Sequence, residues 1–557
     1  RKLLDDLYFF LISICDTICM AFARVYSAQT ELLSGRIVRV EIDTARGLNS
    51  FTIVGLGDRA VDEARDRVGS ALKNAGFESP KTKNQKTVVS LSPADLKKEG
   101  SHFDLSIALG YLVADGLETE DLDSSLFIGE LALDGSVRPV RGILAIAIAA
   151  RDAGFHSIYV PTENGQEAAL VKELTVFPVT ALRELIGHIQ KEKGHIPKDV
   201  LLTEEGPDGK PISAPRPPNK KIEPMPPGSV FREPDKNDTD FGDIVGQESA
   251  KRGLLIAAAG GHNILMYGPP GSGKTMLARA LSGILPKLSD DHSMEVTSIH
   301  SIAGGVHTRG LLGSPPFRSP HHTSSYVSVI GGGTFPKPGE VTLAHRGVLF
   351  LDEFPEFDRR VVEGLREPLE EHFVSISRSK GTATFPAQFL FVAAMNPCPC
   401  GYRGTKTKSC TCTAADLVRY KRKLSGPLLD RIDLALYVGE IAYEKLAKGS
   451  GGAESQNIRA KVSAARAVAY DRARSVGLTP KQNGELKGKD LTLVAKLDAD
   501  TEKIFNESAA RLGLSARAYH RTQKLARTIA DLDGSEHITT EHILEAIRYR
   551  PQIDLLT

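Results

Sequence analysis

The sequence has little excess charge, no membrane-length apolar run and no tandem repeat. Its 557 residues carry 70 Lys and Arg against 69 Asp and Glu. With so small an imbalance, no global electrostatic field favours nucleic acid, and any nucleic-acid surface must be local. No apolar run is long enough to span a bilayer, so we expect no membrane-spanning helix and no membrane partner. What remains is ordinary globular composition, with 41% hydrophobic and 25% charged residues.

A chain of this length is too long for one hydrophobic core, and its composition divides it into five parts. Ten prolines with many charges lie between residues 197 and 234, as expected for a semi-rigid linker. We predict a multidomain α/β protein. Its parts are an N-terminal segment (1–19), an α/β domain (20–190), the linker (191–238), an α/β nucleotide domain (239–445) and a helical C-terminal domain (446–557).

The first nineteen residues have an ambiguous pattern. Residues 7–15 are apolar and follow Arg1 and Lys2, as in a signal peptide, but Asp5, Asp6 and Asp16 interrupt the pattern. No small-residue cleavage site follows. We expect an upstream extension without a structural role, and a targeting segment is the alternative. On the first interpretation the chain is cytoplasmic and its cysteines are reduced thiols or metal ligands.

The most informative motif is a glycine-rich loop between an apolar run (263–267) and a helical pattern (276–281). It reads G-x-x-x-x-G-K-T, and this strand–loop–helix context is typical of a phosphate-binding loop. The backbone N–H groups and the helix N-terminus favour bound phosphates. The lysine would reach the β- and γ-phosphates, and the threonine would hold Mg²⁺. The loop consists of Gly268, Pro269, Pro270, Gly271, Ser272, Gly273, Lys274 and Thr275.

A second apolar run, residues 347–351, ends in two acids, Asp352 and Glu353. After a phosphate-binding loop, this order predicts an ATPase. Asp352 would support Mg²⁺, and Glu353 would polarise the attacking water. Ile244 and Val245 lie about twenty residues before the loop and are candidates to pack against adenine.

Four of the six cysteines form two C-x-C pairs, separated by a short loop that contains two glycines. Four thiolates close together in a reduced compartment suit structural Zn²⁺, although C-x-C is a less usual spacing than C-x-x-C. Free or disulfide-bonded cysteines are the alternative. The predicted ligands are Cys398, Cys400, Cys410 and Cys412.

Three further polar residues complete a resemblance to the AAA+ ATPases, and specifically to their magnesium-chelatase-like branch. Asn396 ends the apolar strand 389–394, and Arg431 and Arg517 are each expected at the end of a helix. The resemblance implies that Asn396 is the first sensor, Arg431 the arginine finger and Arg517 the second sensor. A finger acts on a neighbour's ATP, which requires a ring. A surface ion pair with Asp430 or Asp433 is the alternative for Arg431.

Two insertions also fit that branch. Residues 298–333 are rich in Gly, Pro and His, and we assign the adjacent His321 and His322 a loop role rather than a metal site. Residues 372–385 alternate apolar and polar residues around a glycine-containing turn, which predicts a β-hairpin. Its tip carries Arg378 and Lys380, which are candidates for DNA contact together with Arg318. A solvated hairpin end is the alternative.

Residues 38–178 resemble the proteolytic domain of the Lon family, through residues 92–100, 129–135 and 139–142. That family uses a Ser–Lys dyad in which the amine activates the hydroxyl. Here the serine position falls on His102 and the lysine position on Leu144. Leucine cannot act as a base, so the resemblance implies a scaffold or binding module. The spacing of Ser101 and Lys98 does not favour them as substitutes.

The domain order after Met20 is similar to the ComM/YifB family. The resemblance implies a homohexameric ATPase that uses ATP and Mg²⁺, binds single-stranded and branched DNA, and works beside the recombination machinery. Its activity would be branch migration during integration of transforming DNA. The alternative is a magnesium-chelatase motor subunit that drives Mg²⁺ insertion into a porphyrin, which the Lon-like domain counts against. An ATP-dependent protease is excluded by His102 and Leu144.

Overall fold

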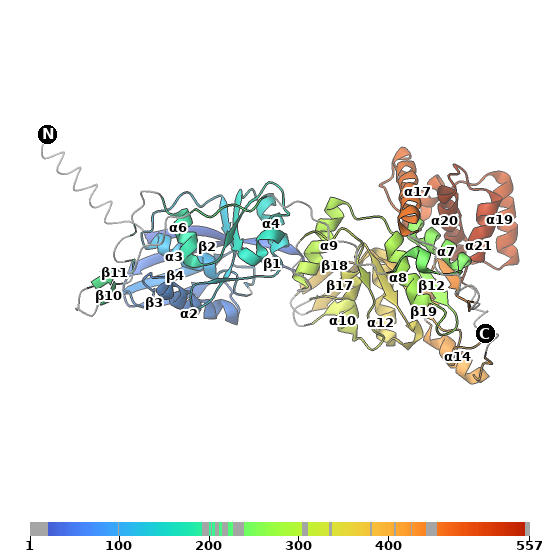
Figure 1. The fold of residues 1–557 in the computed structure, drawn as a ribbon, viewed down its shortest axis with the longest axis horizontal. Helices are drawn as coiled ribbons and strands as arrows, with labels where there is room; N and C mark the ends of the chain where they lie inside the picture. The colour runs from blue at the N-terminus through green and yellow to red at the C-terminus, as the bar shows by residue number, and fades with distance from the viewer. Residues whose placement is uncertain are drawn as a thin grey trace. The chain divides into compact units, whose positions relative to one another are not determined.

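The computed structural model, drawn in Figure 1, describes most of the chain in two compact units. The first unit contains residues up to 233 together with 300–311, and the second contains 234–299 and everything from 312 onward. None of the described helices is long and apolar enough to cross a bilayer. The N-terminal segment 1–19 lies outside the described residues. Those are 21–98, 100–191, 196, 200–201, 203–205, 211–213, 221–226, 239–303, 310–333, 337–378, 381–405, 408–424, 426–441 and 454–551.

The first unit is a mixed α/β domain built on a seven-stranded sheet with the order β3-β4-β2-β1-β5-β8-β9. Alternation along β2 buries Val38, Val40 and Ile42 on one face, as a strand with one covered face requires. Helices α3 and α4 both contact β1 and β2. The strands are β1 (Ala21–Glu31), β2 (Ser34–Arg46), β3 (Ser50–Val54), β4 (Gln85–Ser92), β5 (Ser125–Phe127), β8 (Ser157–Pro161) and β9 (Thr175–Val179).

The helices of this unit are α2 (Arg59–Asn74), α3 (Asp104–Ala114), α4 (Ile143–Asp152), α5 (Thr162–Ala168) and α6 (Leu182–Ile189). Helix α3 is apolar almost all round and is nearly fully buried, so it forms the centre of the core. Two short ribbons complete the unit. They pair β6 (Glu130–Leu131) with β7 (Val137–Arg138), and β10 (Thr203–Glu205) with β11 (Pro211–Ser213).

The second unit has a five-stranded parallel sheet with the order β13-β16-β19-β12-β20. Its central strands are continuous apolar runs because both faces of a parallel sheet are covered. All carboxyl ends of the strands lie at one edge, which is where α/β sheets bind ligands. The strands are β12 (Ile264–Tyr267), β13 (Phe317–Arg318), β16 (Val348–Leu351), β19 (Leu390–Met395) and β20 (Leu434–Tyr437).

Short helices and ribbons connect these strands. The ribbons are β14 (Gly331–Gly332) with β15 (Lys337–Pro338), and the hairpin β17 (Phe373–Arg378) with β18 (Gly381–Pro386). The helices are η1 (Phe241–Asp243), α7 (Glu248–Gly260), α8 (Lys274–Ile284), α9 (Asp290–Ile302), α10 (Tyr326–Ile330), α11 (Glu340–Leu343), η2 (Phe354–Glu356), α12 (Arg359–Gly364), α13 (Arg366–Glu371), α14 (Ala414–Lys423) and α15 (Gly426–Leu429).

The C-terminal region is helical and shares one hydrophobic core with the parallel sheet. Helices α17 and α20 both contact α7, which flanks β12 in the sequence. The elements are α17 (Ser455–Ser475), η3 (Asn483–Glu485), α18 (Gly488–Val494), α19 (Ala499–Arg511), α20 (Ala516–Leu532) and α21 (Thr540–Arg548).

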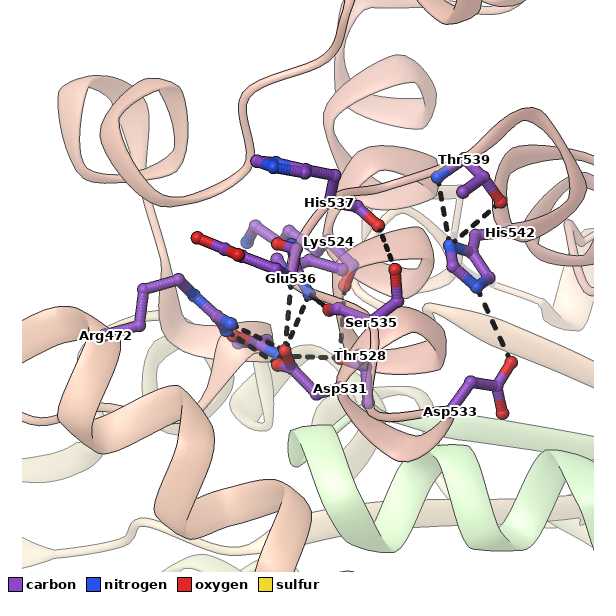
Figure 2. A network of polar contacts seen from close by, with 12 residues as sticks. Arg472, Lys524, Thr528, Asp531, Asp533, Ser535, Glu536, His537, Thr539 and His542 are labelled. Atoms are coloured by element: carbon purple, nitrogen blue, oxygen red, sulfur yellow. Dashed lines mark hydrogen bonds and ion pairs between the residues drawn. The ribbon is translucent and has the colours of Figure 1, made fainter.

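A buried carboxylate ties these helices together, as Figure 2 shows. Asp531 accepts two 2.6 Å hydrogen bonds from Arg472 of α17 and one of 2.8 Å from Asn483 of η3. Arg527, one turn earlier on α20, donates to the same carboxylate at 3.1 Å. Because Asp531 and Arg527 are almost fully buried, loss of either partner would leave an uncompensated charge inside the helical region.

Candidate nucleotide site and metal centre

The predicted phosphate-binding loop connects the carboxyl end of β12 to the first residue of α8. Gly271 and Gly273 adopt left-handed φ angles of 75° and 92°, which side chains disfavour. A Cβ atom on Gly268 would lie 2.0 Å from the carbonyl oxygen of Val438, so the loop depends on glycine there as well. These backbone positions give the loop the shape of an anion cradle at a helix N-terminus.

Lys274 folds back over this loop. Its Nζ donates to the carbonyl oxygens of Gly268 at 2.9 Å and Pro269 at 2.8 Å, and to Oδ1 of Asn396 at 3.3 Å. Burial lowers the pKa of Lys274, because removing the ammonium from water disfavours its charged form. An anionic ligand would supply the missing counter-charge.

The structure brings the other predicted catalytic residues to the same edge. The hydroxyl of Thr275 donates to Oδ2 of Asp352 at 2.7 Å across 77 residues of sequence. Asp352 follows β16, and its Oδ1 accepts the backbone N–H of Glu353 at 2.9 Å. A hydroxyl and a carboxylate oxygen in contact are suitable ligands for Mg²⁺, directly or through water. Asn396 follows β19, the strand between β16 and β12.

Glu353 has a partner that sequence reasoning missed. Nδ1 of His322 lies 3.2 Å from Oε2 of Glu353. Glu353 is exposed and has a left-handed φ of 50°. We expected only a loop role for His322, because no sequence pattern relates a residue in the 298–333 insertion to an acid 31 positions later. The contact places the insertion beside the carboxylate that would act on water.

The residues expected near adenine lie just before α7. Ile244 is buried and Val245 is half-buried. Gln247 adopts a left-handed φ of 58° and donates from Nε2 to the carbonyl oxygen of Gly439 at 2.7 Å. This bond ties the segment to the end of β20, next to the strand that leads into the phosphate-binding loop.

The two predicted arginines each contact an acid. Arg431 forms a close ion pair with Glu370, and only 14% of its side chain is exposed. Arg517 lies at the start of α20, is 64% exposed, and has Nη1 3.6 Å from Oδ2 of Asp430. Glu370 is thus a partner of Arg431 that the sequence did not indicate, whereas the alternatives considered for it were Asp430 and Asp433.

The four predicted zinc ligands form one cluster. Their sulfur atoms lie within 4.8 Å of one another, with separations of 3.4 Å between Cys398 and Cys400, 3.7 Å between Cys398 and Cys410, and 3.5 Å between Cys400 and Cys410. Zn–S bonds of about 2.3 Å at tetrahedral angles place sulfurs about 3.8 Å apart, so the cluster fits a Cys₄ zinc ion. Backbone N–H groups of Tyr402 and Thr411 lower the pKa of Cys400 to about 5, whereas burial raises the pKa values of Cys398 and Cys412 while no metal is bound.

The cysteine loop packs against the nucleotide site. A Cβ atom on Gly401 would lie 2.7 Å from the Pro270 ring of the phosphate-binding loop. The hydroxyl of Tyr420, from α14, donates to the carbonyl oxygen of Asn396 at 3.0 Å. A metal in the cluster would therefore stabilise both the backbone at Asn396 and one side of the phosphate-binding loop.

The predicted hairpin forms between β17 and β18, with Arg378 opposite Gly381 in the ladder. Val374, Ile376 and Phe385 are buried, which anchors the base of the hairpin. The side chain of Arg378 and the whole of Lys380 lie outside the described parts of the chain. Arg318, the third candidate for DNA contact, donates to both carboxylate oxygens of Glu340, at 2.6 and 2.7 Å.

In the first unit, the positions of the expected Ser–Lys dyad do not form one. Leu144 is fully buried in α4. His102 is half-buried, and the neighbouring Ser101 hydroxyl donates to Glu130. Lys98 is fully buried and donates to the carbonyl of Pro93, and burial lowers its pKa.

Three family models match this chain in sequence order. Residues 40–164 match "Subunit ChlI of Mg-chelatase", residues 240–446 match "Magnesium chelatase, subunit ChlI", and residues 452–550 match "Magnesium chelatase, subunit ChlI C-terminal". The first match covers part of the first compact unit, and the other two cover the parallel-sheet and helical regions of the second.

Two individual relatives match nearly the whole chain, and a third matches less than a third of it. The competence protein ComM of Haemophilus influenzae is 39% identical over 541 residues, covering 96% of this chain and 99% of that protein. The uncharacterized protein YifB of Escherichia coli is 39% identical over 516 residues, covering 92% and 94%. The magnesium-chelatase 67 kDa subunit of Chlorobaculum parvum is 29% identical over 163 residues, which cover 28% of this chain and 23% of that protein.

Proposed function

This chain belongs to the magnesium-chelatase ChlI-like family of ATPases and is a full-length homologue of ComM and YifB, and on that premise we propose that it is a DNA motor. It hydrolyses ATP as a ring and drives branch migration when transforming DNA is integrated by homologous recombination. The observation that carries the proposal is the meeting of Lys274, Thr275, Asp352 and Asn396 at one sheet edge, in a chain that matches a competence protein from end to end. We expect it to act in the cytoplasm, where thiols stay reduced.

In the proposed reaction the chain's residues position phosphates and a water molecule. Lys274 would exchange its hydrogen bonds to the loop carbonyls for contacts with the β- and γ-phosphates, and Thr275 and Asp352 would hold Mg²⁺. When bound, Mg²⁺ neutralises part of the phosphate charge. Glu353 orients the attacking water and accepts its proton, while Asn396 fixes the water from the next strand. His322 sets where the Glu353 carboxylate points before ATP is bound.

We propose a ring because an arginine finger acts on the nucleotide of a neighbouring subunit. Arg431 would stabilise the transition-state charge on a neighbouring subunit's ATP, and Arg517 would sense the nucleotide from the helical lid. A contact of this head-to-tail kind closes into a ring when the rotation permits, and we propose six subunits. The ion pairs of Arg431 with Glu370 and of Arg517 with Asp430 describe where each arginine rests in a single chain.

We assign DNA binding to the tip of the β17–β18 hairpin. Arg378 and Lys380 would follow the phosphate backbone in the ring's channel, together with single-stranded or branched DNA supplied by the recombination machinery. The bidentate ion pair with Glu340 makes Arg318 the weaker candidate. The first unit, with Leu144 and His102 at the dyad positions, would be a Lon-like scaffold or binding module without protease activity.

The proposal is tested by measuring ATP hydrolysis with and without single-stranded DNA. The wild-type protein should be stimulated by DNA, and the Arg378→Ala/Lys380→Ala variant should lose stimulation but keep its DNA-free rate. The matched control is Arg359→Ala/Arg360→Ala, which removes the same charge from side chains of α12 that are 89% and 81% exposed. A wild-type protein that ignores DNA would overturn the assignment.

The salt dependence of DNA affinity gives a second, independent test of the hairpin. Two lost phosphate contacts should flatten the slope of log affinity against log salt by roughly one to two units per chain, and should weaken binding to all sequences alike. Equal slopes for the hairpin variant and the control variant would place the DNA path elsewhere.

A magnesium-chelatase motor subunit is the second candidate, because the family models carry that name. The magnesium-chelatase 67 kDa subunits match less than a third of this chain, whereas ComM matches nearly all of it. The two functions differ in their response to DNA. A chelatase motor would be indifferent to DNA and would support ATP-dependent Mg²⁺ insertion into a porphyrin together with the other chelatase subunits.

A further inference from the structure

Arg431 does not present a free charge in this structure. Its guanidinium forms a close ion pair with Glu370, and only 14% of its side chain is exposed, against 46% for the carboxylate partner. A finger must bring positive charge to another subunit's γ-phosphate. An arginine that is neutralised and largely covered by its own chain cannot do so until the pair opens.

The backbone around Arg431 is held firmly on both sides. Nδ2 of Asn263 donates to the carbonyl oxygen of Arg431 at 2.9 Å. Nη1 of Arg521, from α20, donates to the carbonyl oxygens of Leu429 at 3.2 Å and Ile432 at 2.5 Å. With its main chain fixed by these bonds, Arg431 can reach a neighbour most simply by rotating its side chain away from the carboxylate.

Glu370, in contrast, lies on an element joined to the hairpin. It occupies the last turn of α13, three residues before β17 begins at Phe373. The backbone N–H of Ser375 donates to Glu367 of the same helix at 3.4 Å, and that of Ala387 donates to the carbonyl of His372 at 2.7 Å. A displacement of the hairpin must therefore act on the end of α13, where the carboxylate is.

Opening the pair would not leave a buried unpaired acid. Glu370 lines a cleft of about 770 Å³ at the amino-terminal ends of the sheet strands, and Lys487 lines the same cleft. Nζ of Lys487 already donates to the carbonyl oxygen of Glu370 at 3.0 Å. A released carboxylate thus has solvent and an ammonium group beside it, so opening the pair does not bury an unpaired charge.

We propose that Glu370 is an inhibitory positioning residue, which holds Arg431 away from the neighbouring subunit until DNA engages the hairpin and shifts the end of α13. This inference rests on the proposed role of Arg431 as a finger in trans and on DNA contact by the hairpin. It links DNA binding to ATP hydrolysis physically. The Glu370–Arg431 ion pair has a closed and an open state, and DNA, although it contacts only the hairpin, favours the open state.

The test is the Glu370→Gln variant of the full chain, which keeps the side chain's shape and removes its charge. Its ATPase rate without DNA should rise by up to about fivefold, the largest factor expected from losing one partly exposed ion pair. Its DNA-saturated rate should stay at the wild-type value, so the stimulation ratio falls by the same factor. The matched control is Glu371→Gln, one residue along α13, because Glu371 makes no ion pair within the described part of the chain.

Two further variants separate this inference from the proposed function. If Arg431→Ala keeps the DNA-stimulated rate, the finger assignment itself fails. If Arg431→Ala abolishes that rate while Glu370→Gln and Glu370→Ala leave the DNA-free rate at or below wild type, the finger stands and the inhibitory role of Glu370 is refuted. The Glu370→Gln/Arg431→Ala double variant should be as slow as Arg431→Ala alone, because releasing an absent arginine can have no effect.

Discussion

Replacing Cys398 by serine should remove zinc from the protein and loosen the nucleotide site. Three sulfur separations, 3.4, 3.5 and 3.7 Å, are close to the edge of about 3.8 Å that a tetrahedral Zn–S₄ centre requires. They are far above the S–S bond length of about 2.05 Å in a disulfide. A serine hydroxyl is a smaller and harder ligand than a cysteine thiolate. Cys398 is fully buried, so solvent cannot supply a substitute ligand at that position.

The magnitude follows from mass action. With free zinc at a hundredfold excess over its dissociation constant, the bound metal stabilises the folded unit by about 2.7 kcal/mol. For a unit of about 300 residues we expect the melting temperature to fall by roughly 4 °C on metal loss, because the entropy of unfolding grows with chain length. Because Gly401 packs on Pro270 and Tyr420 bonds the carbonyl of Asn396, the KM for ATP should rise as well.

Metal analysis of the purified protein should find about one zinc per chain for wild type and none for Cys398→Ser. The control is Cys15→Ser, which replaces a cysteine of the N-terminal segment that belongs to neither C-x-C pair. A metal-free wild-type protein with a normal melting temperature and normal ATP hydrolysis would refute the zinc centre.

Three other predictions concern the nucleotide site and the helical region. Lys274→Ala should abolish ATP binding in a fluorescent-nucleotide titration, whereas Glu353→Gln should bind ATP without turnover; steady hydrolysis by the Glu353→Gln protein would contradict its assigned role. Equal mixtures of Lys274→Ala and Arg431→Ala chains should recover up to about one quarter of the wild-type rate. About one interface in four then pairs an intact loop with an intact finger. No recovery in rings shown to be mixed would argue against a finger in trans. Asp531→Asn should lower the free energy of unfolding in urea by roughly 3 kcal/mol, since it leaves buried guanidinium groups without a carboxylate; a change under about 0.5 kcal/mol would show that the network contributes little.

Local sequence patterns predicted the elements with strong motifs. The apolar run before the glycine-rich loop is β12, the helix after it is α8, and residues 372–385 form the β17–β18 hairpin. Each of these signals is complete within about a dozen residues, because turn chemistry, helix starts and apolar periodicity are local properties. The paired C-x-C spacing predicted a cluster for the same reason, and the four sulfurs do lie together.

Long-range pairings were beyond the reach of a single sequence. Nothing local indicates that His322 contacts Glu353, that Glu370 pairs with Arg431, or that Asp531 joins several helices. Such pairs depend on the order in which strands and helices pack, and many acids and bases in the chain are equally plausible partners beforehand. The fold had to be known before the contacts of Arg431 could be described.

The measurement that tests the DNA-motor account most directly is branch migration of a synthetic DNA junction by the purified protein. The account predicts that the junction is resolved into its heteroduplex products only when ATP and Mg²⁺ are present, and that Glu353→Gln and Arg378→Ala/Lys380→Ala both fail. Junctions that remain intact with an active ATPase, or that move equally well without ATP, would contradict it.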